Sequence, residues 1–242
     1  MNKKILQVLV ACEESQAVTK ELRKLGHEAY SCDLLPCSGN HPEWHFNIDV
    51  FKVINDLGGK LQNGKSVKVK KWDLMIAHPP CTYLAVSGAR WFYNPADNHL
   101  PMNERTPHPK YPNRKKDQKD AIAFFIKLMN VPIKHIAIEN PIGVISSVYK
   151  KPSQIVHPYM FGDEASKTTC LWLKNLCKLE PTEIVGKGER IQFASGKSQP
   201  KWYSDAFVKA KTPEERRTLR SKTFKGMAEA MAIQWTKFII DG

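Results

Sequence analysis

The sequence predicts an α/β fold with a doubly wound, mostly parallel sheet. Short apolar runs, which are typical of buried strands, alternate with segments that repeat apolar residues at helical spacing. Several of these runs end in polar residues or prolines, as strands do where they reach the carboxyl edge of an open sheet. Strand–helix–strand alternation favours parallel pairing, because right-handed crossovers cover both faces of the sheet with helices.

The first predicted unit is a strand over residues 4–11, a helix over residues 15–25 and a strand over residues 28–32. Ser15 is a favoured N-cap residue, and Gly26 is a helix stop signal. The remaining predicted elements follow in chain order. They are a helix over 49–57, a loop or hairpin over 60–71, a strand over 72–81, a long loop over 82–116, a helix beginning at Asp117, a strand over 135–139, a strand over 168–173, and helices over 212–221 and 224–240.

Two of the predicted strands end in residues with chemical potential. One apolar run leads into His78-Pro79-Pro80-Cys81, and another leads into Glu139-Asn140-Pro141. Two parallel strands ending side by side would place Cys81 and Glu139 in one crevice. A nucleophilic thiol facing a carboxylic acid suits attack on an electron-poor ring. The alternatives are a buried cysteine that acts as a small hydrophobe and a carboxylate that stabilises a helix N-terminus.

These residues carry a family resemblance. Pro79-Pro80-Cys81 resembles the Pro-Cys motif of the cytosine-5 DNA methyltransferases, and Glu139-Asn140-Pro141 resembles their Glu-Asn-Val motif. The segment over residues 226–232 is similar to the closing helix beside the cofactor in that family, and the chain closely resembles its short, phage-type members. The resemblance implies a Rossmann-like methyltransferase fold that uses S-adenosylmethionine.

The resemblance also implies roles for the site residues. Cys81 would add to carbon 6 of cytosine in DNA, and Glu139 would engage ring nitrogen 3 and the amino group. Lys167 would replace the arginine that helps to hold the target base in the family, although lysine lacks the planar fork of arginine.

The expected cofactor site includes the loop after the first strand and the acid after the second. The family carries a glycine-rich turn in that loop, whereas this chain has Cys-Glu-Glu-Ser. Glu13 or Glu14 could meet the ammonium or sulfonium charge of the cofactor. The residues expected at the cofactor are Ala11, Cys12, Glu13, Glu14, Ser15, Asp33, Leu34, Asp49 and Pro79.

The charge of the chain favours a nucleic-acid partner. The sequence has 37 Lys and Arg against 24 Asp and Glu, for a net charge of +13. The basic residues cluster in three runs, which suit a phosphate backbone. The residues expected to contact DNA are Lys110, Arg114, Lys115 and Lys116.

We expect one domain over residues 1–242, with a long basic loop at 82–116 and a small variable region at 181–222. No apolar stretch approaches transmembrane length and no signal peptide is evident, so we expect a cytoplasmic protein without a membrane partner. The spacing of one Cys/His group is too short for a usual zinc finger, which favours a polar loop over a metal site. This group is Cys32, Cys37, His41 and His45.

Three other functions remain open at this point. A non-catalytic nucleic-acid- or cofactor-binding protein would explain the glycine-poor loop and the missing arginine. A pyrimidine modification on RNA or on a free nucleotide would use the same thiol and acid. An amino-methylating enzyme is disfavoured, because His78 and Cys81 stand where those enzymes need a polar acceptor and an aromatic residue.

Overall fold

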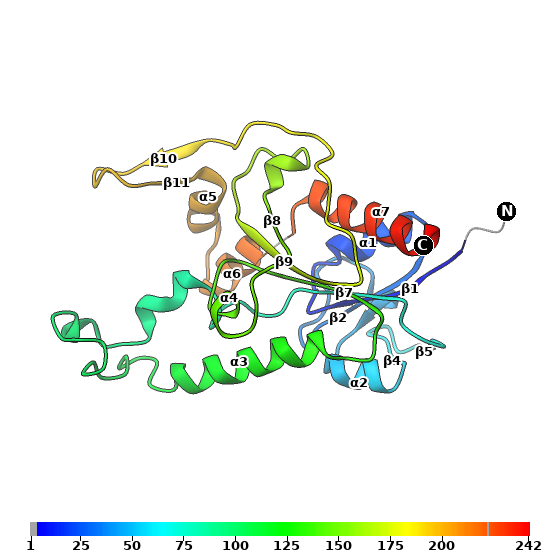
Figure 1. The fold of residues 1–242 in the computed structure, drawn as a ribbon, viewed down its shortest axis with the longest axis horizontal. Helices are drawn as coiled ribbons and strands as arrows, with labels where there is room; N and C mark the ends of the chain where they lie inside the picture. The colour runs from blue at the N-terminus through cyan, green and yellow to red at the C-terminus, as the bar shows by residue number, and fades with distance from the viewer. Residues whose placement is uncertain (1–3, 222) are drawn as a thin grey trace.

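The computed structural model describes residues 4–221 and 223–242, apart from the side chains of residues 213, 214 and 217. Its centre is a seven-stranded sheet in the order β3-β2-β1-β6-β7-β9-β8 (Figure 1). The strands are β1 (Gln7–Ala11), β2 (Glu28–Cys32), β3 (His45–Phe46), β6 (Leu74–Ala77), β7 (His135–Asn140), β8 (Gln154–Val156) and β9 (Thr169–Lys174). The five neighbouring strands β3, β2, β1, β6 and β7 pair in parallel, and β9 is antiparallel to both β7 and β8. The prediction of an α/β fold with a mostly parallel sheet is confirmed.

Helices cover both faces of this sheet. Helices α1 (Ala17–Lys24) and α7 (Lys225–Asp241) pack together on one face, and α2 (Val50–Asn55) and α3 (Arg114–Met129) lie on the other (Figure 1). Alternate side chains of β1 enter the two cores: Val8 packs in the core with α7, and Leu9 in the core with α3. This alternation is the period-2 pattern of a strand that is buried on both faces.

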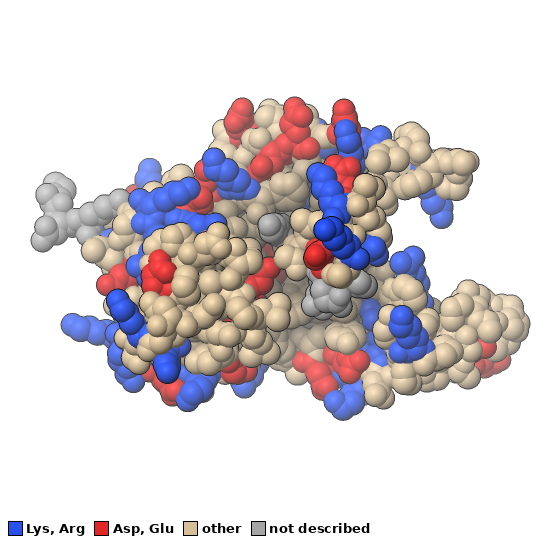
Figure 2. Space-filling model, turned by 180° about the vertical axis from the view of Figure 1, so that it is seen from behind, with Lys and Arg blue, Asp and Glu red and all other residues tan. Residues whose placement is uncertain are grey.

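Two arms project from the end of the molecule where the parallel strands have their carboxyl ends (Figure 1). One arm is the segment 82–113, which contains 3₁₀ helices at Val86–Trp91 and Pro95–Asp97. The other is the hairpin of β10 (Arg190–Gln192) and β11 (Ser198–Pro200). Figure 2 shows an open hollow between the arms, with Lys and Arg side chains gathered along it.

The remaining elements are short or belong to the C-terminal third. Helices α5 (Lys201–Lys209) and α6 (Pro213–Ser221) lie between the two arms in Figure 1. The others are α4 (Ile145–Val148), the antiparallel pair β4 (Gly58–Lys60) and β5 (Ser66–Lys68), and 3₁₀ helices at Pro42–Trp44 and Pro158–Met160. No helix in the described part of the chain is both long enough and apolar enough to cross a membrane.

Two helix starts differ from the sequence prediction. Ser15 does not cap α1, because Gln16 adopts a left-handed conformation (φ 58°) and the buried carboxylate of Glu13 accepts the N–H of Val18 at 2.6 Å instead. Helix α3 begins at Arg114 and not at Asp117. Arg114–Lys116 therefore belongs to the first turn of a helix.

Candidate active site

Cys81 and Glu139 follow two strands that are neighbours in the sheet. Strands β6 and β7 pair in parallel, with Ala77 opposite Ile138, so the residues after each strand emerge at the same edge. The side-chain amide of Asn140 donates to the carbonyl of Pro79 at 2.7 Å. This buried hydrogen bond ties the Pro-Pro-Cys loop to the end of β7 and thereby fixes the half-buried Cys81 near Glu139.

His78 is a part of this site that the sequence analysis did not assign. Its Nδ1 lies 3.2 Å from Oε2 of Glu139, and the two side chains are only 11% and 13% exposed. Its Nε2 is buried and has no hydrogen-bond partner in the described structure. Burial favours the neutral form of Glu139, but the hydrogen bond with His78 and the charge of Lys167 outweigh burial and lower the pKa of Glu139.

Three charged side chains act on the pKa of the Cys81 thiol. Burial raises the pKa of the Cys81 thiol, and the negative charge of Glu139 raises it further. The positive charges of Lys167 and Arg220 act in the opposite direction. The three residues expected to be catalytic therefore lie within electrostatic reach of one another, and Arg220 of helix α6 joins them.

Most of the expected cofactor residues form a second group, at the carboxyl ends of β1 and β2, whereas Asp49 follows β3 and Pro79 follows β6. Burial raises the pKa of Cys12 well above the usual range, and the nearby carboxylates of Asp33 and Asp49 raise it further. Cys12 has a left-handed backbone (φ 58°), a conformation that glycine adopts at lower cost. The chain therefore makes the turn after β1 without the expected glycine.

Asp33 and Leu34, two of the residues expected at the cofactor, follow β2 directly. Oδ1 of Asp33 accepts the N–H of Leu35 at 2.9 Å, and no donor in the described residues reaches Oδ2, which leaves an acceptor for ribose hydroxyls. Leu34 is 74% exposed, so an apolar side chain next to that acid is open to a ligand. Pro79 is buried at the start of the loop after β6.

Four other expected cofactor residues are engaged within the fold. The side chain of Ala11 is buried in the sheet, and Asp49 caps α2 by accepting the N–H of Phe51 at 2.8 Å. The carboxylate of Glu13 caps α1 by accepting hydrogen bonds from Val18 and Thr19. It therefore does not face a ligand ammonium or sulfonium group, and the suggested cofactor contact of Glu13 is not supported. The carbonyl of Glu14 accepts the N–H of Ser38 at 2.8 Å.

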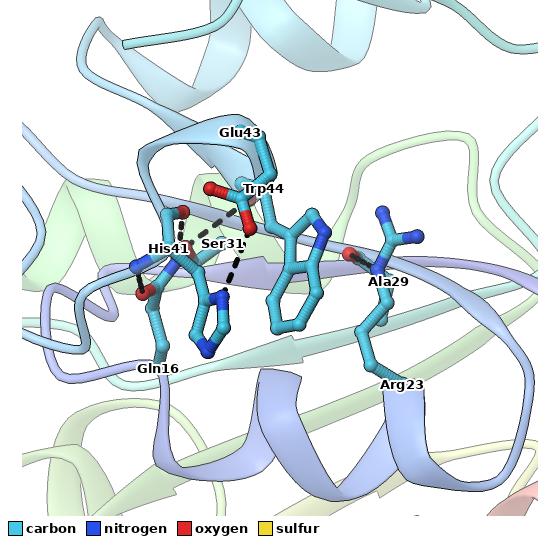
Figure 3. Close-up of polar contacts among 7 residues, drawn as sticks. All are labelled: Gln16, Arg23, Ala29, Ser31, His41, Glu43 and Trp44. Atoms are coloured by element: carbon cyan, nitrogen blue, oxygen red, sulfur yellow. Dashed lines mark hydrogen bonds and ion pairs between the residues drawn. The ribbon is translucent and has the colours of Figure 1, made fainter. Parts of the chain in front are cut away.

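The loop after β2 is fixed on the start of α1, as Figure 3 shows. The side-chain amide of Gln16 donates to the carbonyl of His41 at 2.8 Å and accepts the N–H of His41 at 3.1 Å. The ring of His41 stacks on Trp44 at 3.8 Å, and the guanidinium of Arg23 lies 5.1 Å from the Trp44 ring. These contacts position the loop that carries Asp33.

The Cys/His group in this region is engaged in ordinary hydrogen bonds. Nδ1 of His45 lies 2.8 Å from the hydroxyl of Ser31, and its Nε2 lies 2.9 Å from the carbonyl of Leu35. Cys32 is buried, and its thiol donates to the carbonyl of Ile48. Among the described residues, no group of three or more His, Cys, Asp or Glu side chains is arranged to hold a metal ion.

Arg114 differs from the other three cations expected at DNA. It is only 5% exposed, and its guanidinium donates to the carbonyl of Thr82 at 2.7 Å. Its charge also lies over the rings of Tyr83 and Phe92, at 5.1 and 5.2 Å. Arg114 therefore fastens the arm 82–113 to helix α3 and does not present its charge to a phosphate backbone. Of the four residues expected at DNA, Lys110, Lys115 and Lys116 are exposed.

Replacing Arg114 with methionine is expected to destabilise the protein by about 2 kcal/mol. The change removes two cation–π contacts and leaves the carbonyl of Thr82 without its donor. Urea unfolding measures the loss, and limited proteolysis is expected to cut the arm 82–113 faster. Lys115→Met, at the exposed neighbouring position, is the control and should change stability by less than about 0.5 kcal/mol. Equal effects of the two changes would contradict the structural role of Arg114.

Comparison of the chain with protein-family models found no matching family, and comparison with curated proteins found no matching sequence.

Proposed function

We propose that this protein transfers a methyl group from S-adenosylmethionine to carbon 5 of cytosine in DNA, on a Rossmann-like methyltransferase fold. The observation that supports this proposal best is the cluster at the ends of β6 and β7. A thiol, a carboxyl group and a lysine lie within electrostatic reach of one another there. This combination suits covalent activation of an electron-poor ring.

The proposed reaction begins when Sγ of Cys81 forms a bond with carbon 6 of the ring. The electron pair of the 5,6 double bond then becomes available at carbon 5. S-adenosylmethionine supplies, when bound, the electrophilic methyl group that this carbon accepts. Solvent water accepts the proton of carbon 5, and the electron pair of that bond restores the 5,6 double bond as the bond to Cys81 breaks and releases the thiolate. In a duplex, the target base must first leave the stack.

Glu139 controls how readily the ring accepts electrons. Protonation of ring nitrogen 3 withdraws electrons from carbon 6, and a carboxyl group can deliver that proton. At rest, the lowered pKa of Glu139 leaves its carboxylate ionised, and the raised pKa of Cys81 leaves its thiol protonated. Transfer of one proton from the thiol to the carboxylate therefore produces the reactive pair without any exchange with solvent.

This balance predicts a flat pH profile for the wild-type protein. The resting and reactive forms carry the same number of protons, so kcat/KM is expected to stay level from about pH 6 to about pH 9. It should fall in stronger acid, where Glu139 is protonated and the pair holds two protons, and in stronger base, where the pair loses its only proton. Methyl transfer measured across this range, with DNA binding monitored in parallel, checks the expectation. A rate that rises tenfold per pH unit through neutrality would contradict the shared proton.

Mass spectrometry of nucleosides from DNA treated with the protein and S-adenosylmethionine tests the proposed function. We expect 5-methyldeoxycytidine, and we expect a lasting covalent adduct with DNA that contains 5-fluorocytosine, because fluorine blocks release at carbon 5. DNA binding with neither product would favour a non-catalytic binding protein. Product on RNA or on a free nucleotide alone would overturn the choice of DNA as substrate.

The exposed lysines of the first arm and helix α3 are expected to contribute to DNA binding. Changing Lys110, Lys115 and Lys116 together to Ala removes up to three phosphate contacts. The slope of log affinity against log salt should therefore become shallower by about two to three units. Fluorescence anisotropy with a duplex oligonucleotide at several salt concentrations measures this slope.

A matched triple variant controls for net charge. Lys60, Lys65 and Lys237 are exposed on elements remote from the arms, and their replacement by Ala removes the same charge. We expect this variant to keep a slope within about one unit of the wild type. Equal slopes for both triple variants would show that the arm makes no phosphate contacts.

A further inference from the structure

Helix α6 presents two arginines on one face, four residues apart. The guanidinium carbon of Arg216 lies 4.5 Å from the ring centre of Phe207 on α5. That of Arg220 lies 4.1 Å from the ring centre of Tyr203 and 5.8 Å from that of Phe207. Aromatic faces hold guanidinium groups in place and leave the N–H edges free. We refer to Arg216 and Arg220 as the arginine pair.

The charge of the arginine pair is not compensated within the described structure. The Nε atoms of Arg216 and Arg220 are buried, and no acceptor in the described residues reaches either. No carboxylate among the described residues forms a salt bridge with either guanidinium. Holding two like charges together without an anion costs free energy, so the arrangement favours an anionic ligand between or beside them.

The arginine pair lies on the side of the molecule that carries the catalytic thiol. The indole N–H of Trp202, the neighbour of Tyr203 on α5, donates to the carbonyl of Ser166 at 3.1 Å. Ser166 precedes Lys167, so this bond anchors α5 beside the cation of the proposed site. The charge of Arg220 also lowers the pKa of Cys81, which places its guanidinium within electrostatic reach of the thiol.

We infer that Arg216 and Arg220 form a clamp for a phosphodiester of the DNA strand, next to the cytosine that Cys81 attacks. The planar fork of arginine matches two oxygens of one phosphate, and the aromatic rings of α5 fix the direction of the forks. The clamp rests on the proposed function for the identity of the neighbouring base.

Protection of Cys81 from alkylation tests the clamp without any methyl transfer. The probes are trideoxycytidylate, which has two charged phosphodiesters, and its uncharged methylphosphonate analogue. Iodoacetamide labels Cys81, and peptide mass spectrometry follows the label. For the wild type, we expect the charged probe to protect at a concentration at least about tenfold lower than the neutral one, since a charge-assisted hydrogen bond contributes about this factor or more.

The double variant Arg216→Met/Arg220→Met is expected to lose this preference, so that both probes protect at similar concentrations. Lys60→Met/Lys237→Met removes the same charge from elements remote from the arms and should keep the preference. Protection is compared within each variant, because loss of Arg220 also slows alkylation itself. A preference that persists in the arginine variant, or one that is absent from the wild type, would overturn the clamp.

A second variant decides the matter if the methionine variant fails to fold, as judged by circular dichroism. Arg216→Lys/Arg220→Lys keeps both charges and removes the planar fork, so the preference for the charged probe should fall below the wild-type value. A preference equal to that of the wild type would contradict the clamp. The two proposals can fail separately: absence of methylated product overturns the transfer reaction, whereas the alkylation assay decides on phosphodiester binding alone.

Discussion

Replacing Cys81 with serine is expected to lower methyl transfer by more than about a thousandfold, because the reaction loses its nucleophile. A serine hydroxyl at this half-buried position has a far higher pKa than a thiol, so transfer of its proton to Glu139 is far less favourable. Incorporation of a labelled methyl group into DNA measures the rate. The 5-fluorocytosine adduct should disappear as well.

The matched control for this change is Cys177→Ser. Cys177 is also half-buried and free, but it follows β9 at the opposite edge of the sheet. We expect this variant to keep the wild-type rate and the adduct. DNA binding and S-adenosylmethionine binding should survive in both serine variants. Turnover by Cys81→Ser at more than about a tenth of the wild-type rate would refute the covalent mechanism.

Replacing Glu139 with glutamine should lower methyl transfer roughly a hundredfold or more, the usual scale for the loss of a general acid. The same change should make Cys81 easier to alkylate, because it removes the negative charge that raises the pKa of the thiol. Lower turnover with a more reactive thiol is an unusual combination. This combination distinguishes a chemical role of Glu139 from a general loss of structure. A loss of structure would not be expected to lower the rate of methyl transfer and raise the rate of Cys81 alkylation through the pKa of the thiol.

Lys167→Met should have the opposite effect on the alkylation of Cys81. The charge of Lys167 lowers the pKa of Cys81, so its removal should slow alkylation of the thiol.

The remaining turnover of Glu139→Gln should rise with pH, because that variant needs only the thiolate and no shared proton. If Glu139→Gln keeps more than about a third of the wild-type rate, the carboxylate has no chemical role and serves only as a charge at the end of a strand.

The strands were the most predictable part of this fold. The segment Glu28–Cys32 is predicted as a strand and forms β2 with the same bounds, and its last four residues are buried. The start of α1 was wrong, since local propensity favours Ser15 as a cap and cannot show that the buried Glu13 accepts the same N–H groups. Helix α5 was missed, because its contacts with Ser166 and α6 come from distant parts of the chain.

The site was predictable where one short motif carried the information. Cys81 and Glu139 were identified because each follows an apolar run that ends at a proline or a polar residue. His78 stands in the first motif, yet its hydrogen bond with Glu139 depends on the register of β6 against β7. Arg114 looked like any surface cation in a basic run, and only its packing against Tyr83 and Phe92 identifies it as structural. Arg220 lies 139 residues after Cys81 in the chain, so spacing alone could not connect them.

The position of the two arms has a consequence for how such a protein can diversify. Both the segment 82–113 and the β10–β11 hairpin project at the carboxyl edge of the parallel strands, and neither contributes a strand to the sheet. Their sequences can therefore change in length and composition at little cost to the buried core that holds Cys81 and Glu139. Under the proposed function, changes confined to the arms would alter the preferred target and leave Cys81 and Glu139 in place.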